Sequence, residues 1–402
     1  MSWEFKNLSE ITLLIKRGIS PKYVEQGGIA ILNQKCIRNG VVSYEFSKLC
    51  SSEKKISEDK VIKQGDILVN STGAGTLGRT GFIKEIQNTT TVDTHVTIVR
   101  VDKNQIDNKF LASQLSLKEG EIESMGKGAT NQTELSASDL GRLIITFPPL
   151  PTQKRIASIL SSYDDLIENN LKRIKLLEET AQNIYKEWFV NFRFPNYENT
   201  PFNDETGLPV GWEKTKIGNY CKIGRGSSPR PIKDERFFIE GKIPWIKIAD
   251  ATSSTIFISK TNQYINEFGA SFSRQLTRGS IILAASGTLG FPMILGVDAC
   301  IHDGWIYIYD YDERMKYFQY YQFKSLTEYF YSISYGAAIQ NINTGIVSNA
   351  PVILPTVHLL HKFNDTIEPI FNNIEILQNQ NQKLKEARDI LLPRLMNRTI
   401  EV

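Results

Sequence analysis

The chain has 402 residues, and its 47 Lys and Arg residues against 44 Asp and Glu residues give a formal net charge of +3. Hydrophobic residues make up 41% and charged residues 23%, which excludes a disordered protein and fits a folded one of two or three domains. The near-zero net charge by itself argues against a nucleic-acid partner. No apolar run approaches about 18 residues and no signal-peptide pattern follows Met1, so we expect a cytoplasmic protein.

The four cysteines also restrict the chemistry. Cys36, Cys50, Cys221 and Cys300 are scattered along the chain and form no C-x-x-C pair. This spacing argues against a disulfide framework and against a thiolate zinc site. We therefore expect no metal site.

Predicted strands and helices in the first third of the chain are typical of a mixed α/β domain. Asp66–Val69 and His95–Val101 are rich in β-branched residues and are bounded by Gly or Asp, so they are predicted to be strands. A helix is predicted over Asn108–Glu119. The same order returns later, with strands predicted over Ser280–Leu283 and Gly304–Tyr309 and a helix over Arg314–Ser332. His95 and His302 fall at matching places beside these strands and are interpreted as structural histidines.

A glycine-rich loop follows the first predicted strand. Gly73–Gly78 matches the pattern G-x-G-x-x-G, which binds dinucleotides or S-adenosylmethionine when a helix follows it. Here Arg79–Ile83 follows, with a sequence typical of a turn and a strand, and the later copy Gly287–Gly290 keeps only Gly-Thr-Leu-Gly. We therefore favour a tight turn whose backbone and hydroxyl groups approach a ligand closely.

Two long helices are predicted, the first after Pro148–Pro151 with Thr152 as its N-cap. Their apolar residues are spaced alternately by four and three residues, which is the pattern of a coiled-coil seam. An amphipathic helix lying on its own domain is the simpler alternative, but so narrow a stripe favours antiparallel pairing of the two helices. Each seam holds one asparagine, Asn170 and Asn381, at non-equivalent positions. The predicted pairing residues are Ile156, Leu160, Tyr163, Ile167, Ile174, Leu177 and Ile184 with Phe363, Ile367, Ile370, Ile374, Leu377, Leu384 and Leu391.

The chain repeats itself with a period of about 210 residues. Trp3-Glu4 recurs as Trp212-Glu213, and Arg17–Pro21 recurs as Arg225–Pro229, in the same order as the glycine loops. The fold class is therefore mixed α/β (α+β), with two globular domains joined by two long helices in an antiparallel coiled coil and an internal pseudo-twofold repeat. The expected divisions are globular domains over 1–150 and 212–356, helices over 151–190 and 357–402, and a Pro- and Asn-containing linker over 191–211.

Basic, amide and hydroxyl residues gather in the predicted loops of both units. Between Cys221 and Ala285, ten Lys and Arg residues stand against five Asp and Glu residues, an excess that fits either a phosphate-binding surface or a solvated one. Arg can pair with guanine, and Asn and Gln with adenine. The DNA-binding candidates are Arg17, Lys22, Asn33, Gln34, Lys35, Arg38, Ser71, Thr72, Thr76, Arg79, Lys127, Asn131 and Gln132, then Arg225, Ser227, Ser228, Arg230, Lys233, Lys247, Arg274, Ser286, Thr288, Gln340 and Asn341. We find no catalytic arrangement that recurs in both units.

An ordered set of short motifs resembles the specificity (S) subunit of type I restriction-modification systems. They are Gly-Asp-Ile-Leu (Gly65–Leu68), the Gly-Thr-Leu-Gly loop, Gly-Ala-Thr-Asn-Gln (Gly128–Gln132), the stretch Phe147–Leu160 and Gly207–Trp212. The resemblance covers nearly the whole chain. The sequence departs from the family pattern in the second unit. There Pro355–Leu360 stands where the first helix begins with Pro-Pro-Leu-Pro-Thr-Gln.

The resemblance implies a non-catalytic subunit with two target-recognition domains, each reading half of a bipartite, non-palindromic DNA sequence. It also implies that the helices set the spacing and dock two methyltransferase (M) subunits, with restriction (R) subunits in the full complex. S-adenosylmethionine, ATP and Mg would belong to those partners, and this chain would hold no cofactor. Two other functions fit parts of the sequence: an S-adenosylmethionine-dependent methyltransferase using the Gly73–Gly78 loop, and a coiled-coil assembly scaffold with no DNA role.

Overall fold

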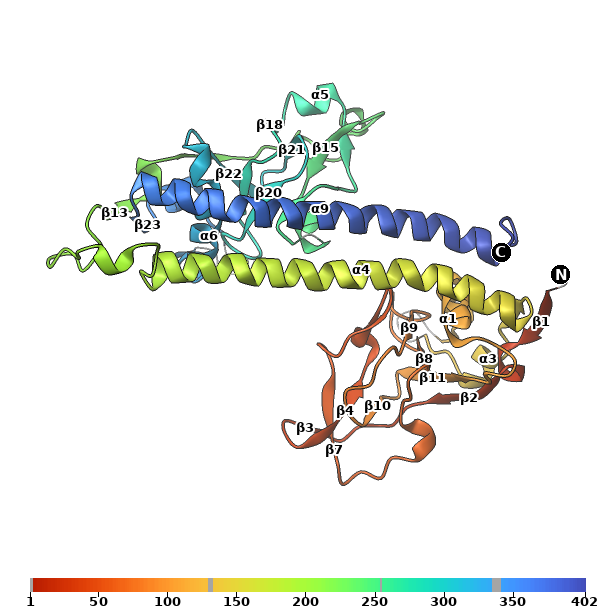
Figure 1. The fold of residues 1–402 in the computed structure, drawn as a ribbon. Coiled ribbons are helices and arrows are strands. Elements are labelled where there is room, and N and C mark those ends of the chain that lie inside the picture. Colours follow the sequence, from red (N-terminus) through yellow and green to blue (C-terminus); the bar gives the residue numbers. More distant parts are fainter. Residues whose placement is uncertain (1–2, 129–132, 254, 335–340) are drawn as a thin grey trace. The chain divides into compact units, whose positions relative to one another are not determined.

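The chain divides into two compact units, of which the first combines two segments that are distant in the sequence and the second is one continuous segment (Figure 1). The computed structural model describes residues 3–128, 133–253, 255–334 and 341–402. Unit 1 consists of Met1–Ile167 with Leu384–Val402, and unit 2 of Glu168–Lys383. Each unit therefore contains part of both long helices, α4 (Leu150–Tyr185) and α9 (Val357–Met396).

Unit 1 contains three sheets. The largest has the order β2-β11-β8-β9-β6-β5, the second the order β10-β4-β7-β3, and β1 pairs antiparallel with β12. The strands are β1 (Glu4–Asn7), β2 (Thr12–Arg17), β3 (Tyr23–Val24), β4 (Gly28–Leu32), β5 (Ile37–Arg38), β6 (Gly40–Val42), β7 (Lys48–Ser51), β8 (Ile67–Asn70), β9 (Thr80–Phe82), β10 (Thr90–Val92), β11 (Val96–Val101) and β12 (Ile144–Phe147). The helices are α1 (Asn108–Leu117), α2 (Glu119–Ser124) and α3 (Ala137–Gly141).

The core of unit 1 lies between the six-stranded sheet and its helices. Ile67 and Val69 of β8 pack in one apolar cluster with Phe110 of α1 and with Leu160 of α4. The Gly-Asp-Ile-Leu motif adds an internal ion pair, because buried Asp66 receives two bonds from Arg100 of β11, at 2.8 and 2.7 Å. This pairing raises the pKa of Arg100 and keeps a charge from being buried alone.

Unit 2 repeats this arrangement. A five-stranded sheet has the order β14-β22-β19-β20-β16, a four-stranded sheet the order β17-β15-β21-β18, and β13 pairs with β23. The strands are β13 (Glu213–Lys216), β14 (Lys222–Arg225), β15 (Ile243–Ile246), β16 (Phe257–Ile258), β17 (Tyr264–Ile265), β18 (Arg274–Leu276), β19 (Ile281–Ala284), β20 (Pro292–Leu295), β21 (Ala299–Ile301), β22 (Trp305–Tyr309) and β23 (Pro351–Leu354). The helices are α5 (Glu267–Ala270), α6 (Lys316–Ser325), α7 (Thr327–Ile333) and α8 (Thr344–Ser348).

Matching hydrogen bonds show that the sequence repeat is a structural repeat. The Gly18 amide donates to the Val96 carbonyl at 3.1 Å, and the Gly226 amide donates to the Trp305 carbonyl at 2.8 Å. A second matched pair involves side chains. The amide of Gln114 donates to the Thr146 carbonyl at 2.8 Å, and that of Gln322 to the Ile353 carbonyl at 3.3 Å. The predicted duplication of a mixed α/β unit is therefore confirmed.

The two long helices pair in an antiparallel manner within unit 2. Asn170 of α4 donates to Asn381 of α9 at 3.0 Å, and both side chains are buried, at 6% and 4% exposed. Further along α4, Tyr185 packs on Phe363, near the start of α9. The seam between these contacts is apolar and includes the predicted residues Ile174, Leu177, Ile184, Ile367, Ile370, Ile374 and Leu377.

Unit 1 contains the remaining parts of both helices. The Asp164 carboxylate of α4 lies 2.6 Å from the Arg388 guanidinium of α9. Ile156 and Leu160 share a core cluster with Leu395, against which Leu391 packs. Tyr163 and Leu384 are half-buried, and Ile167 is buried. The helices run antiparallel here as well.

The helix ends differ from the sequence expectation. Thr152 is not the N-cap, because α4 begins at Leu150 and the Thr152 amide donates to the Pro149 carbonyl. Buried Gln153 holds this start by accepting from the Asp107 amide at 2.8 Å and donating to the Pro148 carbonyl at 2.8 Å. At its other end α4 passes into a π-helical turn, Lys186–Val190.

Three features of the described residues bear on the class of protein: the composition of the helices, the state of the cysteines and the grouping of possible metal ligands. Among the helices in the described ranges, none combines the length and apolar composition needed to span a membrane. The four cysteines are buried and unpaired. No cluster of three or more His, Cys, Asp or Glu side chains suited to a metal ion occurs within the described part of the chain.

Candidate nucleic-acid interface

The glycine loop of unit 1 connects two antiparallel strands. β8 and β9 pair with Val69 opposite Thr80, so no helix follows the loop as a dinucleotide or S-adenosylmethionine site requires. Gly78 has a positive φ, and a Cβ there would lie 2.6 Å from the Glu119 carbonyl of α2. In unit 2, a Cβ on Gly290 would lie 2.2 Å from the ring of Phe330. Packing against the chain's own helices, rather than approach of a ligand, therefore requires these two glycines.

Polar side chains converge on this loop in unit 1. Thr72 bonds His95 Nδ1 at 2.7 Å and Gln34 Oε1 at 3.5 Å. The Thr76 hydroxyl donates to the Thr72 carbonyl at 3.2 Å, and Arg79 donates to the Gly75 carbonyl at 2.7 Å. The fold thus gathers the predicted residues Gln34, Thr72, Thr76 and Arg79, together with His95, which was interpreted only as structural.

Arg17 anchors this loop to a second segment. Its guanidinium donates to the Leu135 carbonyl at 2.8 Å and to the Ser71 carbonyl at 3.3 Å, and it forms an ion pair with Glu134. Lys127 exchanges two backbone hydrogen bonds with Glu134, and its ammonium lies 3.0 Å from Asp139. Arg17 therefore positions the loop, and Glu134 is its partner that sequence reasoning missed.

The other candidates of unit 1 are scattered. The Ser71 side chain is fully buried against Thr97, so it has no surface to offer to DNA. Asn33 accepts from the Lys35 amide and donates to the Phe46 carbonyl, and Lys22 lies 3.7 Å from Glu53. Lys35 and Arg38 are exposed and pair with no carboxylate in the described ranges. Asn131 and Gln132 lie outside the described residues.

In unit 2 the basic residues surround the turn after β21. Arg225 donates to the Asp303 carbonyl at 2.9 Å, and Arg230 forms an ion pair with the Asp303 carboxylate. The Lys247 ammonium lies 4.6 Å above the ring of Trp245, which itself contacts His302 with ring centroids 5.5 Å apart. Burial lowers the pKa of His302; Asp303 opposes this shift, while Lys247, Arg230 and Arg225 add to it. The neutral imidazole is thus favoured in a cationic surrounding.

The remaining candidates of unit 2 lie in three places. Ser286, in the loop after β19, forms a β-bridge with Asn341, and Thr288 of the same loop is exposed. Ser228 accepts from the Asp303 amide at 3.2 Å, and the Ser227 carbonyl accepts from Ser273 at 2.7 Å. Arg274 lies 5.3 Å from the Tyr307 ring, Lys233 is exposed, and Gln340 lies outside the described residues.

The matching of the two histidines was wrong by two residues. The His302 amide donates to the Ile246 carbonyl, and the amide that makes the same bond in unit 1, to Leu32, belongs to Asp93. The two side chains also make the same local bond, each accepting at 2.9 Å from the amide two residues later. A shared framework thus carries a carboxyl group in one unit and an imidazole in the other.

The type I restriction modification DNA specificity domain matches residues 1–179 and 209–386, which is most of both repeats. The chain belongs to this family. It is therefore a DNA-specificity component of a type I restriction-modification system and not its catalytic component.

Similar proteins of this family cover the whole repeat. The type I restriction enzyme MjaIX specificity subunit of Methanocaldococcus jannaschii is 25% identical over 98% of this chain and 92% of its own length. The HindI specificity subunit of Haemophilus influenzae is 25% identical over 84% of this chain and 87% of its own. The crystal structure of the type I restriction-modification S subunit from M. genitalium shares the fold, with a TM-score of 0.62 at 16% identity, covering 98% and 96% of the two chains.

Proposed function

We propose that each globular part of this chain reads one half of a bipartite, non-palindromic sequence in duplex DNA. The two long helices set the distance between the half-sites and dock two methyltransferase subunits. Restriction subunits join the full complex, and S-adenosylmethionine, ATP and Mg are bound by the partners. The chain acts in the cytoplasm, where its DNA target lies.

One observation supports the proposal that the two units recognise different half-site sequences. The turn after β10 and the turn after β21 have the same backbone hydrogen bonds but differ in the side chains at their surface. Unit 1 keeps Asp93 buried and exposes His95, whereas unit 2 has a part-exposed His302. The neighbouring loops differ at one matched position, where Thr72 of unit 1 bridges Glu134 and Ser286 of unit 2 bridges Asn341, while Thr76 and Thr288 are the same residue type. Direct readout depends on which donors and acceptors meet the base edges, so different side chains on one framework favour different sequences.

The length of the helices supports their role as a spacer. α4 has 36 residues and α9 has 40, which correspond to about 54 and 60 Å at about 1.5 Å per residue. Sites on one face of a duplex recur about every 34 Å. Rods of this length therefore suit two recognition events that are separated by one to two helical turns.

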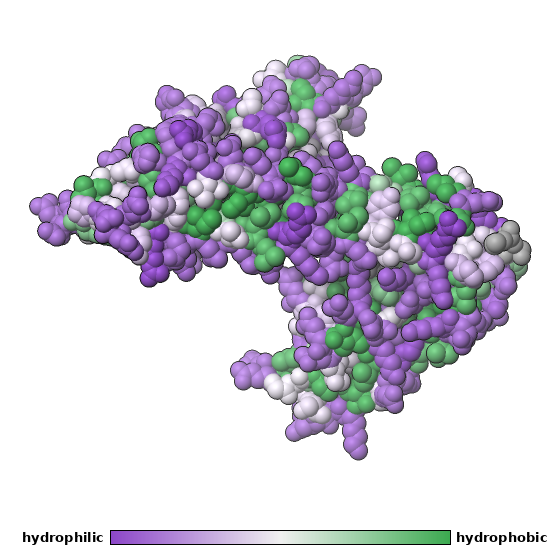
Figure 2. Space-filling model, in the orientation of Figure 1, coloured by the Kyte–Doolittle hydropathy of each residue, from purple (hydrophilic) through white to green (hydrophobic). Residues whose placement is uncertain are grey.

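Apolar side chains on the helix surfaces support the docking of protein subunits. Three large apolar residues of the helices are exposed in unit 2: Leu171 and Leu176 of α4 and Ile376 of α9. Contiguous exposed apolar patches mark sites of protein–protein contact. Figure 2 shows hydrophobic patches over the helical part on an otherwise mostly hydrophilic surface.

Methylome sequencing of a host that expresses this chain with its methyltransferase subunit tests the proposal. We expect one modified motif with two unlike half-sites and a fixed spacer. A palindromic motif would contradict it, as would equal affinity of the assembled complex for target and scrambled duplexes. Binding of S-adenosylmethionine to the isolated chain would instead support the methyltransferase alternative.

A further inference from the structure

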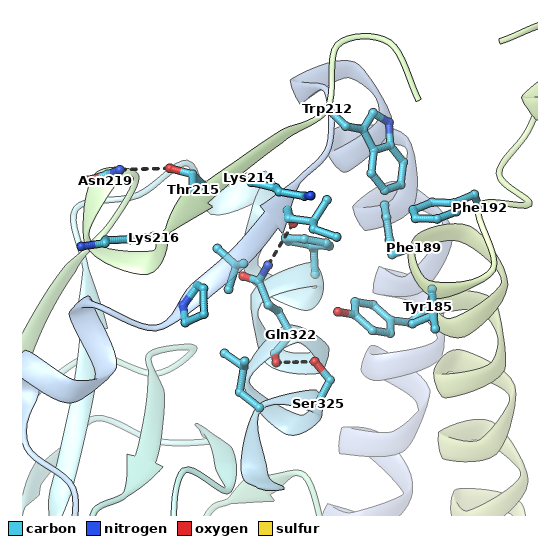
Figure 3. A pocket seen from close by; sticks show the side chains of 16 residues that line it. Tyr185, Phe189, Phe192, Trp212, Lys214, Thr215, Lys216, Asn219, Gln322 and Ser325 are labelled. Atoms are coloured by element: carbon cyan, nitrogen blue, oxygen red, sulfur yellow. Dashed lines mark hydrogen bonds between the residues drawn. The ribbon is translucent and has the colours of Figure 1, made fainter. Parts of the chain in front are cut away.

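Unit 2 contains an open pocket between the end of α4, the two-stranded sheet and α6 (Figure 3). Its volume is about 790 Å³, within the range of pockets that hold a ligand or a large side chain. Four residues supply an aromatic wall: Tyr185 at the end of α4, Phe189 of the π-helical turn Lys186–Val190, Trp212 before β13 and Phe318 of α6. These rings pack on one another, with Phe189 4.8 Å from Phe318 and 6.0 Å from Trp212 between centroids. The wall is therefore formed before anything binds.

The rim of the pocket is polar and positively charged. Lys214 and Lys216 of β13 are exposed lining residues, and the sixteen residues that line the pocket include no carboxylate. Gln322 is fixed by donating to the Ile353 carbonyl and by accepting from the Tyr220 hydroxyl. The pocket thus complements an apolar group that has negative charge beside it.

The pocket is separate from the candidate DNA-reading turns of the same unit. It lies where β13 and β23 meet the end of α4, whereas the turn at His302 follows β21 in the other sheet (Figure 1). A molecule in the pocket and DNA at the reading turns can therefore bind at the same time.

Equivalent elements leave apolar surface exposed in unit 1. Three residues of the pocket define the comparison. Lys214 is the second residue of β13, Ser325 is the last residue of α6, and Pro351 is the first residue of β23. The same positions of β1, α1 and β12 hold Phe5, Leu117 and Ile144, which are 76%, 43% and 54% exposed. The residues at the matched positions differ in type, but equivalent elements form the pocket in unit 2 and the apolar patch in unit 1. A binding feature on equivalent elements of both repeats is expected if two copies of one partner bind there.

We infer that the pocket anchors an aromatic or large aliphatic side chain from an acidic segment of a methyltransferase subunit. The Phe5, Leu117 and Ile144 patch receives the same segment of a second copy. This inference rests on the proposed docking of two such subunits and adds the place of contact and the chemistry of the segment.

Filling the mouth of the pocket tests the inference. Ser325 is exposed, and its hydroxyl donates to the carbonyl three residues earlier at 2.7 Å. Ser325→Trp should therefore occupy the mouth, with the loss of the hydrogen bond between Ser325 and Tyr185 but with the ring contacts of the aromatic wall kept. Ser332→Trp is the matched control, because Ser332 on α7 is exposed, makes the same bond at 2.7 Å and does not line the pocket.

We expect the full-length S325W chain, mixed with purified methyltransferase subunit, to bind one copy where wild type and S332W bind two. Mass photometry gives the stoichiometry, and loss of one anchoring side chain should weaken that binding event by about thirty-fold or more. Lys214→Glu should weaken the same event, whereas Lys242→Glu, a charge reversal away from the pocket, should not. Phe5→Ser should remove the other copy.

The outcomes separate this inference from the proposed function. If wild type binds no methyltransferase subunit, the proposed docking fails. If S325W and F5S each bind two copies with unchanged affinity, only the inference fails. A nucleotide or S-adenosylmethionine that raises the Tm of wild type but not of S325W would also overturn it, because the occupant would then be a small molecule.

Discussion

The basic residues proposed to meet DNA fall into two chemical groups. Arg17, Lys127 and Arg230 are held by carboxylates of the same unit, so a phosphate must compete with an existing ion pair. Lys35 and Arg38 have no such partner among the described residues and are exposed. The second group should supply electrostatic affinity at lower cost, because no ion pair has to open first.

Replacing both Lys35 and Arg38 by Ala should weaken DNA binding of the assembled complex to target and non-target duplexes alike. Each lost phosphate contact should lower the slope of log K against log salt by about 0.9. Fluorescence anisotropy over a salt series measures this slope. Lys103→Ala, an exposed lysine outside the candidate set, is the control, and an unchanged slope in the double variant would remove these residues from the interface.

The sequence predicted the candidate residues of the glycine-rich loop but not the hydrogen bonds that hold them together. Gln34, Thr72, Thr76 and Arg79 were chosen for their type and their place near turns, and the fold brings them together. The partner of Arg17 could not be found in this way, because Glu134 is more than a hundred residues away and reaches it only through the tertiary fold. The burial of Ser71 was missed for the same reason, since a loop residue is assumed to be solvated.

At the scale of the elements, the helix seam followed directly from its periodicity. The spacing by four and three identified the apolar stripe, but the positions of Asn170 and Asn381 in the repeat gave no sign that they face each other. In the antiparallel pair they meet in a buried seam, where the Asn170 amide donates a hydrogen bond to Asn381. The π-helical turn Lys186–Val190 has no periodic signal and was not predicted.

The asparagine pair gives a stability prediction. Asn170→Leu should destabilise the protein by about 1–3 kcal/mol, because the buried Oδ1 of Asn381 loses the hydrogen bond that Asn170 donates. Leu at both positions should recover most of that loss, since both polar groups are then replaced by apolar ones. Urea unfolding of the two single variants and the double variant gives the interaction free energy between Asn170 and Asn381. Additive effects would mean that the two amides do not depend on each other.

The spacer role gives a prediction for DNA recognition. One heptad inserted into α4 and one at the opposing position of α9 should lengthen the pair by about 10 Å, equivalent to about three base pairs. Methylome sequencing should then report the same half-sites with a longer spacer. The control replaces seven residues of each helix without changing its length. An unchanged spacer after the insertion would contradict the proposal that the helices set the distance between the half-sites.

For the whole molecule, the net charge of +3 conceals an uneven distribution, with basic residues concentrated around the turn at His302. Arg225→Gln together with Lys247→Gln should therefore alter only one half of the recognised motif. Methylome sequencing of the variant should show relaxed preference in one half-site, with the other half and the spacer unchanged. Relaxation of both halves would mean that the two units do not read independently.

Unit 1 also has a consequence for the order of folding during synthesis. Its core joins Ile156 and Leu160 to Leu395, so the N-terminal unit includes residues that leave the ribosome roughly 230 positions later. At about 5–20 residues per second, the apolar face of α4 in unit 1 waits about 10–50 s for its partner. During that interval the nascent chain exposes Ile156 and Leu160 to other polypeptides. Chaperone demand should therefore be highest just before α9 emerges.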